Sequence, residues 1–200
     1  MKSGTLIHSL RRSSLLLSSL ALLACGQPES EVTETEGLPE PIATMPEDGE
    51  RSAQAVDPAQ LAKFRAEMLA AVNKARAVAR KCGTTSYAAA PPLKANAKLD
   101  TASQGHAASM AAKNFFSHTG LDGSSPFDRM KRAGYSFSYA GENIAAGNST
   151  VSTTMTQWLN SPGHCANIMN KNFTELGIGY DYGASSTYKH YWVQNFGKPL

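Results

Sequence analysis

The sequence predicts an α+β domain in which helices pack on a small, mainly antiparallel sheet. Two observations lead to this fold class. Four segments carry apolar residues at helical spacing and are bounded by capping residues, prolines or glycines. Three later segments are rich in aromatic and β-branched residues and are bounded by glycines, as strands usually are. Such a mixture of elements packs as an α+β domain or as a sandwiched α/β/α domain.

The first predicted helix begins after Asp57, which can cap it, with Pro58 at the first helical position. Basic residues gather near its end, and Gly83 follows Cys82. We expect five or six turns. Its apolar stripe is formed by Leu61, Phe64, Met68, Val72 and Ala75.

Three further helices are expected at 94–114, 125–134 and 149–160. In the second of these Ser125 is the cap, Pro126 opens the helix and Gly134 closes it. The inward-facing residues of the last two helices are Phe127, Met130 and Ala133, and then Val151, Met155, Trp158 and Leu159. The predicted strands are 135–145, 174–183 and 188–197.

The N-terminus has the pattern of an export signal. Basic residues precede an apolar run from Leu15 to Ala24 that is too short to span a bilayer. The run ends in "LLAC", which resembles the lipobox of bacterial lipoproteins, so Cys25 is the expected site of lipidation. The alternative is an ordinary signal peptide with cleavage nearby. Gly26 is not the aspartate associated with inner-membrane retention, which points to the outer membrane if the organism has one.

Charge divides the rest of the chain into two parts. Segment 26–59 has nine acidic residues and one basic residue, whereas 60–200 has 15 basic and seven acidic residues, a net charge of +8. Prolines and like charges in 26–56 predict a disordered acidic tether. The expected organisation is therefore a signal at 1–25, a tether at 26–56 and a folded domain at 57–200.

A basic domain surface can attract several kinds of partner. The basic residues are scattered, and export removes the chain from most nucleic acids, so we expect no nucleic-acid partner. A polyanionic envelope glycan or a lipid head group suits the charge better. A surface that only confers solubility is an equal alternative.

The chain contains three cysteines. If Cys25 is lipidated, Cys82 and Cys165 remain as an even pair in an oxidising compartment, where a disulfide is the default. The alternative is a nucleophilic Cys165 activated by the adjacent His164.

Five motifs occur in an order that resembles the CAP superfamily, which includes cysteine-rich secretory proteins and bacterial SCP-like extracellular proteins. They are "FFSHTG" (115–120), "GENIAAG" (141–147), "WLNSPGHCANIM" (158–169), "LGIGY" (176–180) and "YWVQNFG" (191–197). The resemblance extends over about residues 60–198. It implies a three-layer α/β/α sandwich of the CAP type with a solvent-facing cleft.

In that family the cleft holds two histidines and two acidic residues that can bind a divalent cation such as Zn²⁺. The matching positions here are His118, Glu142 and His164, whereas the second acid falls on Ser161, which has no charge. Two imidazoles and one carboxylate suit zinc, with a fourth position left to water. The alternative is a hydrogen-bonded polar network that fixes the loops of the cleft. Asn143 and Gln194 are expected to line the floor of the cleft or to hold its backbone.

The resemblance also supports the Cys82–Cys165 pair, because similar bacterial members often have cysteines at both positions. The bridge closes a loop of about 84 residues and should contribute around 4 kcal/mol. His106 lies on the same helix face as Leu99 and Met110, so we interpret it as structural.

The favoured function is that of a lipid-anchored, monomeric recognition or scaffolding module of the bacterial cell envelope. Its ligand would be an envelope glycan, a peptide or a lipid, and its cleft would be able to bind a divalent cation. The alternative is a metal-dependent hydrolase of peptide or cell-wall substrates, with His118, Glu142 and His164 as the catalytic residues. The missing second acid favours the non-catalytic role.

Overall fold

The computed structural model describes residues 56–200. In chain order its elements are α1 (Pro58–Arg76), β1 (Arg80–Cys82), β2 (Thr85–Tyr87), β3 (Lys94–Ala95), α2 (Ala97–Lys113), α3 (Pro126–Arg132), β4 (Phe137–Ala146), α4 (Val151–Asn160), α5 (Pro162–Met169), β5 (Glu175–Tyr182) and β6 (His190–Pro199). The expected signal, Cys25 and the tether up to residue 55 lie outside the described residues. Val56 already packs against the core.

The main sheet has the strand order β3-β5-β6-β4. β6 pairs antiparallel with β5 on one side and with β4 on the other, and the short β3 pairs parallel with β5. β1 and β2 form a separate antiparallel hairpin. The expectation of a small, mainly antiparallel sheet is confirmed, and β4 lies at its edge.

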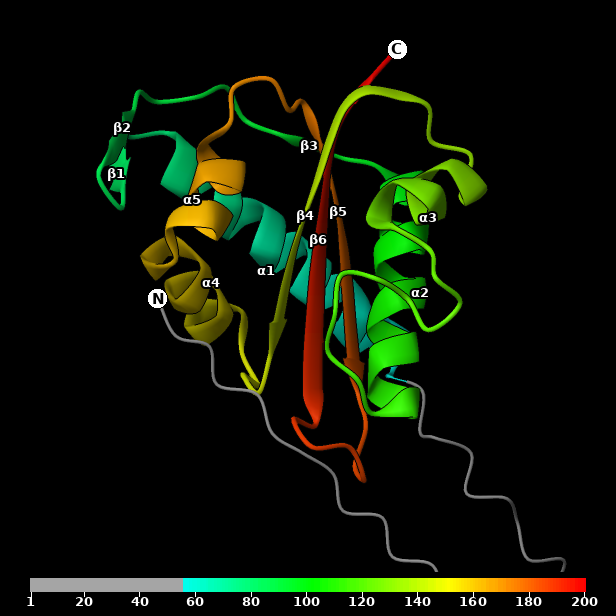
Figure 1. Cartoon of the computed structure of the whole chain (residues 1–200). Coiled ribbons are helices and arrows are strands. Elements are labelled where there is room, and N and C mark those ends of the chain that lie inside the picture. Colours follow the sequence, from blue (N-terminus) through cyan, green and yellow to red (C-terminus); the bar gives the residue numbers. More distant parts are fainter. Residues whose placement is uncertain (1–55) are drawn as a thin grey trace, which may run out of the picture. The chain divides into compact units, whose positions relative to one another are not determined.

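Helices cover both faces of this sheet. α1, α4 and α5 lie on one face, and α2 and α3 lie on the other (Figure 1). The arrangement has three layers, as the α/β/α sandwich requires. Alternate residues of a strand point to opposite faces, so on β4 Glu142 faces α2 and α3, whereas Asn143 faces α5. This alternation sends neighbouring polar residues to different sides of the edge strand.

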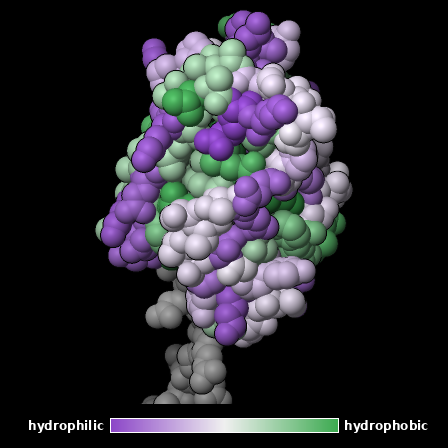
Figure 2. Space-filling view, turned by 90° about the vertical axis from the view of Figure 1, so that its left-hand side faces the viewer, coloured by the Kyte–Doolittle hydropathy of each residue, from purple (hydrophilic) through white to green (hydrophobic). Residues whose placement is uncertain are grey.

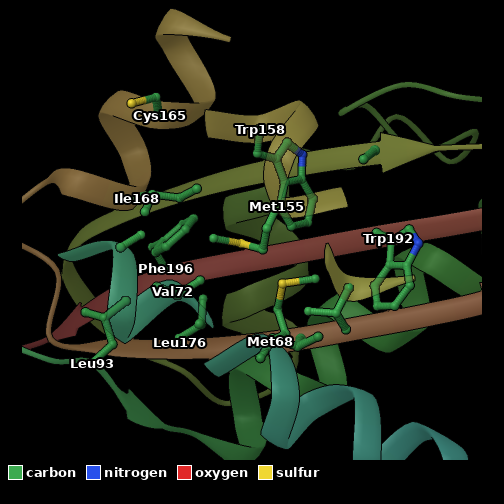
Figure 3. Close-up of a cluster of buried hydrophobic side chains, with 14 of the residues drawn as sticks. Met68, Val72, Leu93, Met155, Trp158, Cys165, Ile168, Leu176, Trp192 and Phe196 are labelled. Carbon is green, nitrogen blue, oxygen red and sulfur yellow. The ribbon is translucent and has the colours of Figure 1, made fainter. Parts of the chain in front are cut away.

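The larger hydrophobic core lies between the sheet and the layer of α1, α4 and α5. Figure 3 shows that Met68 and Val72 of α1, Met155 and Trp158 of α4, and Trp192 and Phe196 of β6 meet there. A smaller cluster on the other face joins Ala107 and Met110 of α2 to Ile144, Tyr191 and Val193 of the sheet. On the side that faces left in Figure 1, hydrophobic residues are visible between hydrophilic ones (Figure 2).

Two glycines of β5 allow α2 to approach the sheet. A Cβ at Gly177 would meet the backbone of Leu99 and Asp100, and one at Gly179 would meet the backbone of Ser103. The helix therefore lies directly on the strand, and its polar residues bond to it. Asp100 accepts from the Ile178 amide at 2.7 Å, and Gln104 exchanges two hydrogen bonds with Tyr180.

The expected five or six turns of the first helix are confirmed, because α1 has 19 residues and ends at Arg76, with Cys82 beyond it on β1. The other helices differ from the expectations in two details. α2 begins at Ala97, not near 94, since Asn96 caps it. Phe127 is exposed instead of facing inward, and its ring centroid lies 5.9 Å from that of Phe137. Met130 alone of α3 is buried.

The described residues contain no helix with both the length and the apolar composition needed to cross a membrane.

Candidate functional site

The predicted site residues His118 and Glu142 contact each other directly. His118 follows α2 in a loop, and Glu142 lies on β4. Nδ1 of His118 donates to Oε1 of Glu142 at 2.8 Å. The carboxylate is almost completely buried, with 2% of the side chain exposed, whereas half of the imidazole is exposed. The exposed ring can meet a ligand, and the carboxylate orients it from below.

Glu142 is held by two further donors. Arg129 of α3 donates from Nη2 to Oε2 at 2.8 Å, and the Arg129 side chain is only 10% exposed. The side-chain amide of Asn195 on β6 lies between Glu142 and Ser103. With its nitrogen toward Glu142, it donates to Oε2 at 3.1 Å and accepts from the Ser103 hydroxyl at 3.0 Å. Both carboxylate oxygens are therefore occupied.

Arg129 also fixes the loop that carries His118. Its Nη2 donates to the His118 carbonyl at 3.0 Å, and its Nη1 donates to the Ser124 carbonyl at 3.0 Å. The guanidinium thus connects α3, the loop and β4. Sequence reasoning missed this residue, because nothing in the local sequence distinguishes Arg129 from the other scattered basic residues.

His164 lies in the first turn of α5. Its Nδ1 atom is buried and has no hydrogen-bond partner within the described part of the chain. The pKa of His164 is lowered, mainly by burial and secondly by the charge of His118. Both effects favour the neutral imidazole, which is the form that accepts a proton or binds a metal.

A buried amide network holds His164 in place from the other face of β4. Asn143 donates to the His164 carbonyl at 3.1 Å and to Oε1 of Gln194 at 3.2 Å. Asn167 of α5 donates to Oδ1 of Asn143 at 2.9 Å and to the Glu142 carbonyl at 3.3 Å. Asn143 therefore acts on the backbone of the site, and Asn167, which sequence reasoning missed, links α5 to β4.

Ser161 joins α4 to α5. It is the C-cap residue of α4 and the N-cap residue of α5, and its side chain makes no capping hydrogen bond to α5. Pro162 then opens α5, as expected of a proline at the first helical position. The position of the second family acid therefore carries an uncharged hydroxyl between two helices.

The disulfide between Cys82 and Cys165 is confirmed. It ties α5 to β1, with the two Cα atoms 5.5 Å apart. Since Cys165 is bonded, it lacks the thiol that nucleophilic catalysis needs, and that alternative is wrong for this structure. His106 is also structural, because it is 1% exposed and its Nε2 donates to the Ser117 carbonyl at 2.8 Å.

A divalent cation has little support from these contacts. Among residues 56–200, no group of three or more His, Cys, Asp or Glu side chains is arranged to hold a metal ion. Arg129 already supplies positive charge to Glu142, so a cation would compete with a guanidinium for the same carboxylate. In this arrangement the residues do not form a three-ligand zinc centre, and the binding of a divalent cation by His118, Glu142 and His164 stays a prediction.

Comparison with known proteins identifies relatives of this fold. The family model described as the Cysteine-rich secretory protein family, CAP, matches residues 69–196. The Bacillus subtilis protein YkwD is 40% identical over 105 residues, which cover 52% of this chain and 39% of YkwD. The B. subtilis membrane protein YlbC is 36% identical over 92 residues, which cover 46% of this chain and 25% of YlbC. The matches therefore span less than half of either relative.

Two solved structures share the fold. An extracellular protein containing a SCP domain from Bacillus anthracis aligns with a TM-score of 0.58 and 27% identity, over 72% of this chain and 44% of that protein. An outer surface protein from Borrelia burgdorferi aligns with a TM-score of 0.59 and 20% identity, over 74% of this chain and all of that protein. The second likeness shows the fold alone.

Proposed function

Because the chain belongs to the cysteine-rich secretory protein (CAP) family, we propose that it is an exported bacterial envelope protein whose cleft recognises a ligand without catalysing a reaction. The observation that carries this proposal is the state of Glu142. Its two oxygens accept from His118 and Arg129, both at 2.8 Å. A carboxylate engaged in this way orients its neighbours, and it is a poor general base because its lone pairs are already directed at donors.

The residues around Glu142 favour a preformed recognition surface. The exposed imidazole of His118 is fixed by Glu142 on one side of β4, and the backbone of His164 is held on the other side by Asn143. A binding site gains affinity when its polar groups are ordered before the ligand arrives. An envelope glycan, peptide or lipid would meet these imidazoles in the cleft. Ser161 adds a hydroxyl where a second acid would be needed for acid–base chemistry.

Binding to isolated cell-wall sacculi tests the recognition function. The exported full-length chain should co-sediment with sacculi, and His118→Ala should reduce that binding. His190→Ala is the matched control, since His190 lies on β6 outside the site and bonds to Tyr180. Equal binding by the His118 variant and the parent would argue against recognition through this cleft.

We also propose that the chain is held in the envelope by acyl groups on Cys25. The proposal rests on the apolar run that ends in "LLAC", and the description of the related B. anthracis protein as extracellular supports export. Mass spectrometry of the intact protein from membranes should show the mass of added acyl chains. A Cys25→Ser variant should appear in the soluble fraction, because acyl chains provide the anchor. An unmodified Cys25 in the parent would contradict the anchor.

The alternative function is a cation-dependent hydrolase of peptide or cell-wall substrates. The His118–Glu142 hydrogen bond favours it, since a buried carboxylate behind an exposed histidine also occurs in general-base pairs. Calorimetry with zinc on the full-length chain and on a His118→Ala/His164→Ala variant tests the cation. Zinc-dependent turnover of wall peptides by the parent, lost in the variant, would replace the recognition function with the hydrolase.

A further inference from the structure

A pocket lies between α2 and α3. Its volume is about 390 Å³, and none of the predicted cleft residues His118, Glu142, Ser161 and His164 lines it. A pocket of this size can hold a small molecule. Arg129 connects this pocket to the candidate site, because it lines the pocket and also donates a hydrogen bond to Glu142.

Gly105 of α2 keeps this pocket open. A Cβ at Gly105 would have no atom within 4 Å, and the residue has no positive φ. Neither close packing nor backbone conformation therefore requires a glycine there. In the middle of a helix, glycine costs about 1 kcal/mol relative to alanine. What the missing side chain provides is space over the helix, next to Ala102 and Ala133.

The charges around the pocket are mainly positive. Lys113, Arg129 and Arg132 line it, against one acidic residue, Asp122. Arg132 bonds to Asp122 at 3.0 Å, but both side chains are more than half exposed, so water screens this pair strongly. Lys113 makes no ion pair with any other described residue. Ala102, Gly105 and Ala133 form an apolar part of the lining, and the three basic side chains also line the pocket.

We propose that the pocket between α2 and α3 binds a small organic anion. Its apolar body would lie over Gly105, and its carboxylate or phosphate group would meet Lys113 and Arg132. This site is separate from the cleft, so the proposal stands whether or not the cleft recognises an envelope ligand.

Calorimetry with simple anions tests the proposal on the exported full-length chain in mild detergent. The probes are benzoate, phenyl phosphate, inorganic phosphate and, as the oppositely charged match, benzylamine. We expect saturable binding of benzoate or phenyl phosphate, and which of the two binds more tightly identifies the acidic group. Inorganic phosphate, which lacks the apolar body, and benzylamine should bind at least about ten-fold more weakly.

Two variants place the binding in the pocket. Gly105→Leu fills the space above α2, and Lys113→Gln removes the cation; each should weaken binding by about ten-fold or more. Ala66→Leu, at an exposed position of α1 on the other face of the sheet, and Lys171→Gln, on the surface after α5, are the matched controls and should bind as the parent does. Circular dichroism checks that every variant is folded.

The proposal is overturned if neither organic anion binds, if benzylamine or inorganic phosphate binds as tightly as they do, or if folded Gly105→Leu binds like the parent. If Gly105→Leu does not fold, Lys113→Gln decides in the same way against Lys171→Gln.

Discussion

Arg129 and Glu142 form a nearly buried ion pair that lies behind His118. Nη2 of Arg129 is 2.8 Å from Oε2 of Glu142, and the two side chains are 10% and 2% exposed. The pair connects α3 to the edge strand β4 and holds the loop between α2 and α3 through the His118 carbonyl. It is the feature on which both the charge and the shape of the candidate site depend.

Removal of Arg129 should destabilise the fold. Arg129→Met leaves the buried Glu142 carboxylate without its cation, which costs about 3 kcal/mol. Arg132→Met, which breaks the exposed pair with Asp122, should cost less than about 1 kcal/mol. Urea unfolding of both variants measures the difference, and equal losses would contradict the importance of the buried pair.

Removal of Arg76 should also destabilise the fold, although it has no acidic partner among the described residues. Its guanidinium is fully buried and donates to the carbonyls of Pro91, Ile168, Asn170 and Phe173. Burial lowers its pKa. Arg76→Met leaves several buried carbonyls unpaired, at about 1–3 kcal/mol for each. Lys74→Met, on the exposed face of α1, is the control, and the midpoint of its urea unfolding should equal that of the parent.

Loss of the disulfide should lower stability without a change of fold. Cys82 and Cys165 are 83 residues apart, so a Cys82→Ser/Cys165→Ser variant should lose about 4 kcal/mol of unfolding free energy. Urea unfolding of the oxidised parent and the variant measures this. A thiol assay on the unfolded parent should detect no free thiol at Cys82 or Cys165, and a thiol there would contradict the bridge.

Substitution by alanine should change the stability of the fold in opposite directions at Gly177 and at Gly105. Gly177→Ala places a Cβ against the backbone of Leu99 and Asp100, which cannot move without displacing the helix, so we expect a loss of about 3 kcal/mol. Gly105→Ala meets open space and should raise stability by about 0.5–1 kcal/mol. Thermal unfolding of the two variants tests both signs together.

Stability should fall as the solution becomes acidic. Burial, and secondly the charge of Arg129, lower the pKa of His106. An exposed imidazole in the unfolded chain has a pKa of about 6.5, so below that pH the unfolded chain binds a proton before the folded chain does. The free energy of unfolding is therefore highest above about pH 6.5 and decreases below it.

Urea unfolding at several pH values checks this dependence, and proton NMR of the His106 ring gives its pKa directly. His106→Gln should flatten the decrease in part, since the pKa values of His164 and His190 are lowered as well. A His106 pKa above that of an exposed histidine would contradict the prediction.

The sequence predicted the main helices and strands because their signals are local. At two helix starts, the side chains of Asp57 and Ser125 accept hydrogen bonds from backbone amides of the first turn. The prolines that follow them, Pro58 and Pro126, have no amide hydrogen that would need a partner there. The exposure of Phe127 was missed because inward and outward faces of a two-turn helix depend on what packs against it, and only Met130 meets the core. β1 and β2 were missed because they are three residues each.

By itself, the sequence determined the α+β class, the order of four helices and three strands, and the cysteines available for the Cys82–Cys165 bridge, because spacing, caps and composition act between near neighbours. Only the tertiary structure decided that Arg129 neutralises Glu142, that Asn143 holds His164 from the opposite face, and that Gly105 opens a pocket. These contacts join residues from different elements. Their partners are set by strand pairing and helix packing, which no local pattern encodes.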